Sequence, residues 1–335
     1  QILICISIVY LLYNPKLISH TISTLLIVET GLTCTYFQDK FKDQFVNNHV
    51  IAQYSIPIHK ASKKLQTKIK KHMDLEKSAA KFAHVLTSVG ILTFMPFIGD
   101  EYDITISIRL MTDYSDGFIR QLLYWYDIYI INLFGYYALE FPLILIKRNR
   151  VIYYQYMILN EMIENLKYEF NFELNYKNII DCIKSHINLT ILSEHLLISN
   201  SKFGTVLPIL LAETVFLQIS SVYFILAEIS PRSNFRFIVT LIFTFYITGK
   251  FIQSGQEIKD ASEQICQTIY NTDWYKWDDP SKKALLMMLR QCARPVSFSV
   301  FKAIDLDYKL VPSVSIQLFY KRVQKTLIFS INQIK

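Results

Sequence analysis

Residues 255–295 read GQEIKDASEQICQTIYNTDWYKWDDPSKKALLMMLRQCARP and follow an apolar run at 235–253. Four apolar residues recur there at spacings of three or four: Ile258, Ala261, Ile265 and Ile269. This spacing predicts a helix with one apolar stripe and otherwise polar faces. A simple connection between membrane spans needs no such stripe. We therefore expect this helix to dock on another element on its own side of the membrane.

The rest of the chain has the composition of a membrane protein. Its 335 residues are 52% hydrophobic and 19% charged, which is more apolar and less charged than is usual for soluble domains. A membrane helix needs roughly 20 mostly apolar residues. Seven segments are candidates: 1–13, 18–37, 80–98, 118–146, 203–229, 235–253 and 310–334. Because the chain opens inside the first of these, we expect it to lack its true N-terminus.

The connections between these spans differ in charge. Residues 38–81 are rich in lysine, 99–117 are acidic, and 147–150 are basic again. The positive-inside rule places 38–81, 147–185 and 254–300 in the cytoplasm. The N-terminus is then cytoplasmic and the C-terminus extracellular, opposite to a G-protein-coupled receptor, whose DRY and NPxxY motifs are also missing. The net charge of +7 is explained by contact with membrane lipid, without a nucleic acid partner.

The sequence contains no pattern typical of an enzyme, a metal site or a cofactor site. HExxH, GxGxxG and GxxxxGK[ST] are absent, and the five cysteines form no CxxC pair. We expect buried free thiols, no metal, no cofactor and no catalysis. Carboxylates inside spans are rare and face the protein interior, where they serve a ligand, an ion pathway or hydrogen bonds between helices. Four residues are of this kind: Glu29, Asp127, Glu140 and Glu213.

Residues 255–295 resemble the C-terminal signature of the insect odorant receptors. The first part of that signature is matched by Gly255, Ser262, Tyr270 and Trp274. A basic pair, an apolar helix and a basic-proline end follow in the family's order, as Lys282-Lys283, Leu285–Leu289 and Arg294-Pro295. Upstream, the CIKSH sequence of 182–186 looks like the family's Cys-Ile-x-x-His pattern before the fifth helix.

The resemblance implies an all-α, seven-transmembrane-helix receptor with a cytoplasmic helical anchor region at 255–295. It also implies one receptor domain over 1–335, in the plasma membrane of a sensory neuron dendrite. The family's members are subunits of odorant-gated, non-selective cation channels that form heterotetramers with a co-receptor. The anchor helices join the subunits in this family. The apolar stripe and its neighbours are therefore expected at the subunit interface, through Ile258, Ile265, Ile269, Trp274 and Leu285.

The same resemblance places a volatile ligand among the outer halves of the middle helices. An apolar, aromatic-lined cavity suits small volatile molecules. Given the orientation above, the expected lining residues are Met95, Phe97, Tyr126, Tyr129, Phe216, Ile219, Tyr223 and Phe237.

The last span, 310–334, is the predicted pore helix. Its expected pore residues are Thr326, Ser330 and Gln333, and the pattern departs from the family at Lys321, Arg322 and Lys325. Basic side chains are unfavourable in a cation pore. Two alternatives therefore stay open beside an odorant-gated channel: a gustatory-type receptor of the same superfamily, and a non-conducting ligand-binding subunit.

Overall fold

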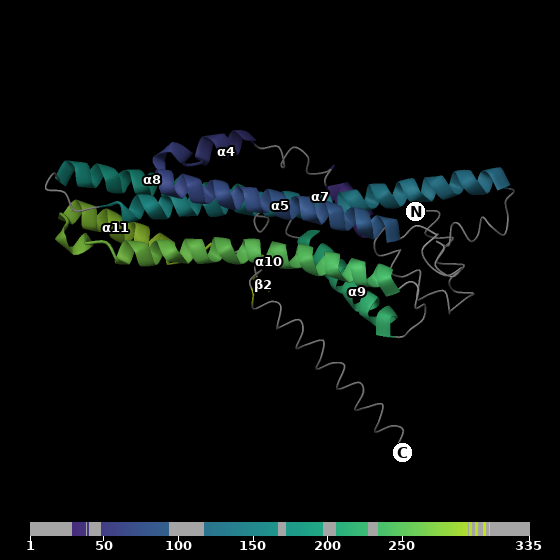
Figure 1. The fold of residues 1–335 in the computed structure, drawn as a ribbon. Helices are drawn as coiled ribbons and strands as arrows, with labels where there is room; N and C mark the ends of the chain where they lie inside the picture. The colour runs from purple at the N-terminus through teal and green to yellow at the C-terminus, as the bar shows by residue number, and fades with distance from the viewer. Residues whose placement is uncertain are drawn as a thin grey trace, which may run out of the picture. The chain divides into compact units, whose positions relative to one another are not determined.

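The computed structural model describes residues 29–37, 39, 48–93, 117–166, 172–196, 206–226, 234–293, 295–296, 299–300, 304–305 and 308. Its long helices (Figure 1) are α5 (Lys63–Thr93), α7 (Gly117–Glu164), α8 (Phe172–Leu196), α9 (Val206–Leu226) and α10 (Asn234–Tyr270). Shorter elements are α4 (Asn48–Tyr54), η1 (Ile58–Lys60), η6 (Trp274–Lys276) and α11 (Asp279–Cys292). Two-residue strands, β1 (Ser299–Val300) and β2 (Ile304–Asp305), pair antiparallel. The predicted all-helical class is confirmed.

The predicted spans are helical wherever the structure describes them, and the long helix α8 lies outside them. The spans predicted at 80–98, 118–146, 203–229 and 235–253 fall in α5, α7, α9 and α10. Residues 29–37 of the second predicted span are helical as well. The spans predicted at 1–13 and 310–334 lie outside the described residues.

Length and composition single out α10 within the described part of the chain. It is the one helix there that contains a window long and apolar enough to cross a membrane, with a mean hydropathy of 1.5. A shorter apolar stretch, Pro208–Tyr223, lies in α9.

The described helices form two compact units. The first comprises the described residues within 1–47, 67–147 and 206–250, and the second those within 48–66, 148–205 and 251–335. Helices α7 and α10 each contribute residues to both units. The sequence analysis expected one domain with anchor helices at 255–295. The second unit contains that stretch and adds α4, α8 and the end of α7.

In the first unit, α10 is tied to the end of α5. The Arg236 guanidinium is 5% exposed, and its Nε donates to the carbonyl oxygen of Thr93 at 2.9 Å. This bond ties the start of α10 to the last described residue of α5. Further along α10, the Tyr246 hydroxyl donates to the carbonyl oxygen of Ala79 at 3.2 Å.

One glycine in the first unit is required by close helix packing. A Cβ added at Gly31 would lie 2.6 Å from the Cβ of Phe134 on α7 and 3.0 Å from its carbonyl oxygen. Small residues allow helix backbones to approach in this way in membrane proteins. Gly31 therefore brings the helical segment 29–37 against α7, and this contact forms one side of the pocket described below.

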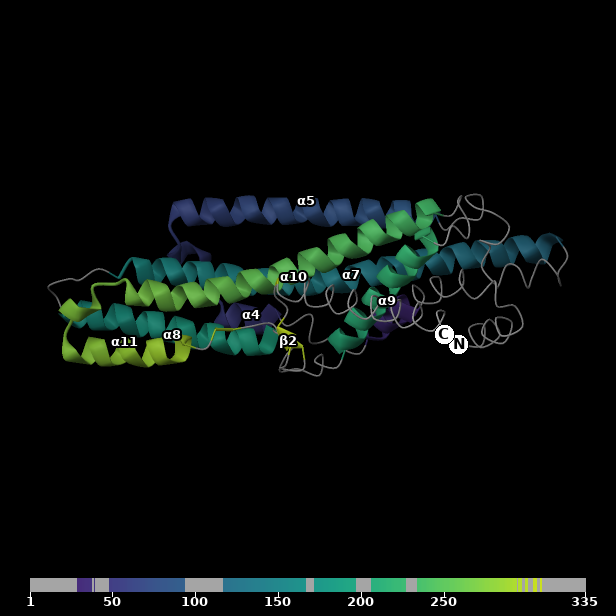
Figure 2. The same ribbon diagram turned by 90° about the horizontal axis from the view of Figure 1, so that it is seen from below.

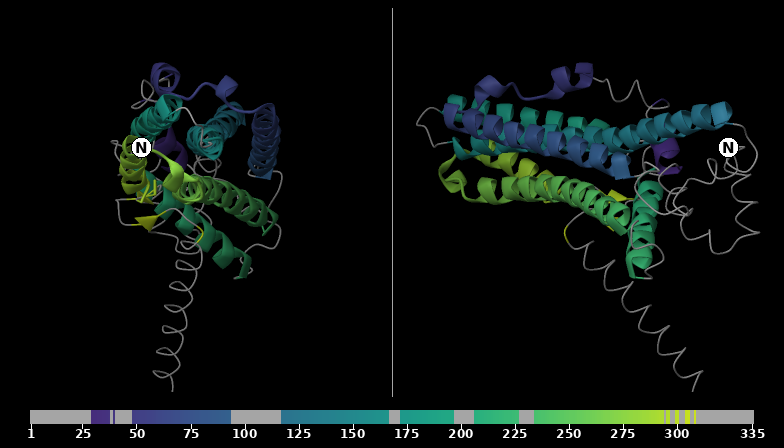
Figure 3. Two further views of the ribbon diagram at one scale, coloured as in Figure 1. Left: turned by 90° about the vertical axis from the view of Figure 1, so that its left-hand side faces the viewer. Right: turned by 45° about the vertical axis from the view of Figure 1, so that its right-hand side comes forward.

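In the second unit, α8 packs against α4 and α11 (Figures 2 and 3). The sequence 278–281 starts α11 in a well-defined way, because the Asp278 side chain accepts from the Ser281 backbone N–H at 3.4 Å and Pro280 occupies the first turn. The buried face of α11 then follows helical spacing: Ser281, Ala284, Leu285, Met288 and Cys292.

The apolar stripe of α10 belongs to the core of this second unit. Ile258, Ile265 and Ile269 are 0%, 1% and 0% exposed, and Leu285 of α11 is 1% exposed. The expected place of these residues at a subunit interface stays a prediction. The chain's own helices cover these four side chains, so contact with another subunit is not what buries them. Trp274, the fifth residue expected at the interface, is partly exposed.

Polar contacts tie α7 to α10 within the second unit. The Arg150 guanidinium pairs with the Glu257 carboxylate, and the Asn149 amide donates to the Ser254 hydroxyl at 2.9 Å. Further along, the Thr268 hydroxyl donates to the Asn160 side-chain oxygen at 2.6 Å. Because these groups are largely buried, their mutual hydrogen bonds are what make their burial tolerable.

Candidate ligand pocket

The first unit contains a partly open cavity of about 150 Å³ with mainly apolar walls. Residues from all five of its helical segments line it: Thr30, Cys34, Leu86, Thr87, Gly90, Ile91, Gly135, Ala138, Pro142, Leu210, Thr214, Leu217, Val239, Thr240, Phe243, Thr244, Ile247 and Thr248. Ligand sites between the helices of bundles have this character, with few polar groups among apolar ones. Its volume equals that of an apolar protein cavity known to bind benzene, about 150 Å³.

Small residues on facing helices leave this space open. Gly90 of α5 and Gly135 of α7 carry no side chain, and Ala138 lies about one turn after Gly135. A Cβ at Gly135 would come 3.1 Å from the Ile91 side chain, and one at Gly90 would come 3.8 Å from Val239. The sequence therefore keeps the helices close together while removing side-chain volume at the centre.

Threonine hydroxyls supply most of the polar lining of the cavity. The hydroxyl of Thr87 donates to the carbonyl oxygen of Ala83 at 2.9 Å. Those of Thr214 and Thr244 donate to carbonyl oxygens one turn earlier in their helices, at 2.7 and 3.1 Å. Such bonds satisfy the hydroxyl proton inside a membrane helix, and the methyl group keeps the wall partly apolar.

A carboxylate lies next to this wall. Glu213 of α9, immediately before the pocket residue Thr214, is 9% exposed. Its Oε1 accepts a hydrogen bond from the Thr33 hydroxyl at 3.3 Å, and Thr33 precedes the pocket residue Cys34. Its Oε2 is buried and has no hydrogen-bond partner among the described residues. Of the four carboxylates predicted inside spans, Glu213 is thus an interior one in contact with a second helix.

The residues predicted to bind the ligand lie elsewhere in the first unit. Tyr126, Phe216, Ile219 and Tyr223 are between 44% and 62% exposed on the outside of the chain. Tyr129 lines a more open pocket together with His84, Asn132 and Tyr136. Phe237 is 4% exposed, two residues before the pocket residue Val239. None of these six lines the 150 Å³ cavity, and Met95 and Phe97 lie outside the described residues.

The threonines that line the cavity were not among the residues predicted from the sequence, although the threonines of α10 recur at a regular spacing. Thr240, Thr244 and Thr248 recur every fourth residue within a predicted span, on one face of the helix. A polar stripe on an otherwise apolar membrane helix indicates a face turned toward other helices or a cavity. The predicted pore residues Thr326, Ser330 and Gln333 lie outside the described residues.

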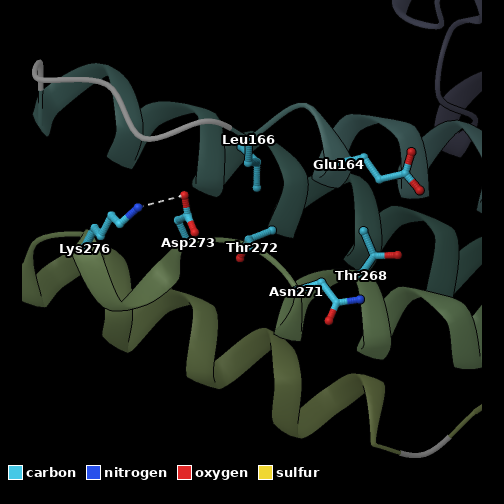
Figure 4. A pocket seen from close by; sticks show the side chains of 7 residues that line it. All are labelled: Glu164, Leu166, Thr268, Asn271, Thr272, Asp273 and Lys276. Atoms are coloured by element: carbon cyan, nitrogen blue, oxygen red, sulfur yellow. Dashed lines mark hydrogen bonds and ion pairs between the residues drawn. The ribbon is translucent and has the colours of Figure 1, made fainter.

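The second unit has a different kind of hollow, an open one of about 620 Å³ where α7 and α10 end (Figure 4). Apart from Leu166, the residues that line it are polar: Glu164, Thr268, Asn271, Thr272, Asp273 and Lys276. The Lys276 ammonium lies 3.1 Å from an Asp273 carboxylate oxygen and lowers the pKa of that carboxyl. A hollow with many charged and polar groups offers an apolar ligand little apolar surface to bury, so the cavity of the first unit is the better site for an apolar ligand.

The second unit also buries thiols and an imidazole. Cys292 Sγ of α11 lies 3.3 Å from His186 Nε2 of α8, and either atom can donate, depending on the tautomer. Burial raises the pKa of Cys292 and of Cys182 to about 12 and lowers that of His186. The predicted buried free thiols are confirmed for Cys34, Cys182 and Cys292.

Long helices, one of them apolar enough to cross a membrane, around a small and largely apolar cavity are typical of helical membrane proteins. The family model described as 7tm Odorant receptor matches residues 81–311, more than half of the chain. This chain belongs to the odorant receptor family, whose members are multi-pass membrane receptors rather than enzymes. A Drosophila melanogaster relative assigned as odorant receptor 85d is 28% identical over 93 residues, which cover 28% of this chain and only 22% of that relative's length.

Solved structures share the fold. The insect olfactory receptor OR5 from Machilis hrabei matches with a TM-score of 0.65 at 12% identity, over 90% of this chain and 80% of that one. The same receptor in complex with eugenol matches with a TM-score of 0.68 at 11% identity, over 94% and 82%. The predicted insect odorant receptor fold is confirmed. The orientation of the termini stays a prediction.

Proposed function

We propose that this chain is the odorant-binding subunit of an odorant-gated, non-selective cation channel that works with a co-receptor in a heterotetramer. The single observation that supports it best is the apolar cavity of the first unit, in a chain of the odorant receptor family. The solved receptor of the same fold was obtained with eugenol, a small molecule. Plasma-membrane placement in a sensory neuron dendrite belongs to the same proposal.

The cavity suits a volatile ligand for a physical reason. Burial of apolar surface contributes roughly 25 cal/mol per Å², so a small molecule gains affinity mainly by being fully enclosed. A cavity of about 150 Å³ encloses a compact molecule and leaves no room for a large one. The outer residues of the sequence-based prediction, such as Phe216 and Tyr223, are exposed and cannot enclose a ligand by themselves.

Two neighbouring residues of α9 test the location of the site. Leu217 is 7% exposed and lines the cavity, whereas Phe216 is 62% exposed on the outside. Leu217→Trp fills the cavity and should raise the odorant concentration for half-maximal current by about tenfold or more. Leu217→Ala enlarges it and should shift the best response to longer homologues. Phe216→Trp is the matched control and should respond like wild type.

The measurement is current from cells that express the full chain with a co-receptor, during application of a volatile panel that includes eugenol. Surface labelling confirms that each variant reaches the membrane. If the Leu217→Trp receptor responds to odorants like wild type while the Phe216→Trp receptor no longer responds, the binding site lies at the outer residues instead. Ligand-induced thermal stabilisation of the purified chain without current would identify a non-conducting binding subunit and contradict the channel part of the proposal.

A further inference from the structure

Three of the six threonine hydroxyls that line the 150 Å³ cavity can act only as hydrogen-bond acceptors. A threonine hydroxyl has one proton and two lone pairs. Three of these hydroxyls donate their proton to a carbonyl oxygen of their own helix: Thr87 at 2.9 Å, Thr214 at 2.7 Å and Thr244 at 3.1 Å. Their oxygens can therefore only accept a further hydrogen bond. These three residues come from α5, α9 and α10, so acceptors face the cavity from three sides.

Glu213 adds a further acceptor beside the same wall. Its carboxyl accepts from the Thr33 hydroxyl and also lies next to the Thr30 hydroxyl, while Oε2 is buried without a hydrogen bond of normal geometry among the described residues. An incompletely satisfied buried acceptor favours a donor that reaches this part of the molecule. Thr33 and Glu213 stand next to Cys34 and Thr214, which line the cavity from the segment 29–37 and from α9.

The other three threonines of the lining differ from these. Thr30 lies next to Glu213, whereas Thr240 and Thr248 can donate or accept. A ligand with one O–H group can donate its single proton to one of the acceptors and can accept from Thr240 or Thr248. A ketone, an aldehyde or an ether can only accept a hydrogen bond.

We propose that this receptor selects compact, largely apolar molecules with one hydroxyl group, which donates its proton to the acceptors of the α9 wall around Thr214. The inference rests on the proposed function of the cavity and adds the ligand's chemical class. A hydroxyl fits better than an ammonium group, because a full positive charge would lose its hydration in a mainly apolar cavity. The volume limits the ligand to about the size of a single ring with one short substituent.

The test compares molecules that share a skeleton and differ in one group. The probes are benzyl alcohol, benzaldehyde, toluene and benzylamine, with the cyclohexyl and hexyl counterparts as further skeletons. For the wild-type receptor, we expect the alcohol to reach half-maximal current at a concentration about tenfold below that of the aldehyde and the hydrocarbon. Thermal stabilisation of the purified chain should follow the same order.

Conservative variants then locate the acceptor. Thr214→Val keeps the shape of the side chain and removes its oxygen, so the preference for alcohol over aldehyde should fall severalfold while the response to toluene persists. Thr35→Val is the matched control, because the Thr35 hydroxyl donates to the Gly31 carbonyl oxygen at 2.7 Å but does not line the cavity. It should keep the wild-type preference.

Two kinds of failure can be told apart. Equal potency of alcohol and aldehyde, or a stronger response to benzylamine, would overturn the hydroxyl assignment and leave the proposed function standing. A wild-type preference that survives Thr214→Val would overturn the role of the α9 wall. Absence of current and of thermal stabilisation for every probe, with the receptor at the cell surface, would overturn the proposed function itself.

Discussion

His186 shows how a single buried side chain makes the stability of the second unit depend on pH. It comes from the CIKSH sequence of 182–186, and its Nε2 lies 3.3 Å from Cys292 Sγ, while its Nδ1 has no partner among the described residues. A protonated imidazole would need a second acceptor that this environment does not supply. Burial therefore lowers the pKa of His186 below the ordinary value of 6.5.

The sign of the pH effect follows from this lowered pKa. Below pH 6.5 an unfolded chain protonates His186 while the folded chain does not. Stability is therefore complete above pH 6.5 and decreases as the pH falls toward the lower folded value. We expect the melting temperature of the purified chain to decrease as the pH is lowered below 6.5. In the His186→Asn variant this decrease should be smaller.

The exposed His59 provides the control for this prediction. His59→Asn should keep the wild-type dependence of the melting temperature on pH. A His186→Asn chain whose melting temperature follows the wild-type pH curve would show that His186 is not the group responsible.

At the scale of elements, α7 and α10 are held together by a buried ion pair. The side chain of Arg150 is 5% exposed and that of its partner Glu257 is 19% exposed. Gln253 Nε2 donates to the same carboxylate at 2.8 Å, and the Arg150 guanidinium also lies over the Tyr153 ring, 5.9 Å from its centre. Removing one partner of such a pair leaves the other charge buried without compensation, which is more damaging than removing both.

We expect Arg150→Met to lower the free energy of unfolding by about 3 kcal/mol. This value is at the lower end of the range for breaking a buried ion pair, because Gln253 still donates to Glu257. The double variant Arg150→Met, Glu257→Met should recover part of this loss. Lys77→Met is the matched control, since the Lys77–Asp74 pair is highly exposed and exposed pairs contribute about 0–1 kcal/mol. Chemical unfolding of the purified chain measures all three, and equal losses in Arg150→Met and Lys77→Met would contradict the role of burial.

At the scale of the whole molecule, the apolar residues of the second unit separate into two sets. Ile265 and its stripe are covered by the chain itself, whereas Leu286 and Met287 on the outer face of α11 are 54% and 70% exposed. If this unit joins subunits, as the proposed function requires, the exposed set is the one that can contact a partner. The subunit contact proposed for the anchor region therefore moves from the stripe to the outer face of α11.

This separation predicts opposite outcomes for two substitutions by aspartate. Ile265→Asp places an unpaired charge in the core and should prevent the chain from folding stably, with or without the co-receptor. Met287→Asp should leave the melting temperature of the single chain unchanged and reduce its co-purification with the co-receptor. Normal co-purification of Met287→Asp would exclude this face of α11 from the interface.

The amino-acid sequence by itself determined the local and periodic features of this receptor. The apolar runs predicted where α7, α9 and α10 lie, because length and hydropathy are properties of one segment. The spacing of Ile258, Ile265 and Ile269 predicted a buried face on α10, and the residues of 182–186 and 255–295 indicated the family. These features need no knowledge of what lies opposite a side chain.

Only the tertiary structure decided what those faces meet. Periodicity shows that a stripe is buried but does not show by what, so the α10 stripe was expected at a second subunit and lies in the chain's own core. The cavity brings together Thr30 and Thr248, residues more than half the chain apart, and its space comes from Gly90 and Gly135 on different helices. A void depends on how several helices pack at once, and no single segment encodes that.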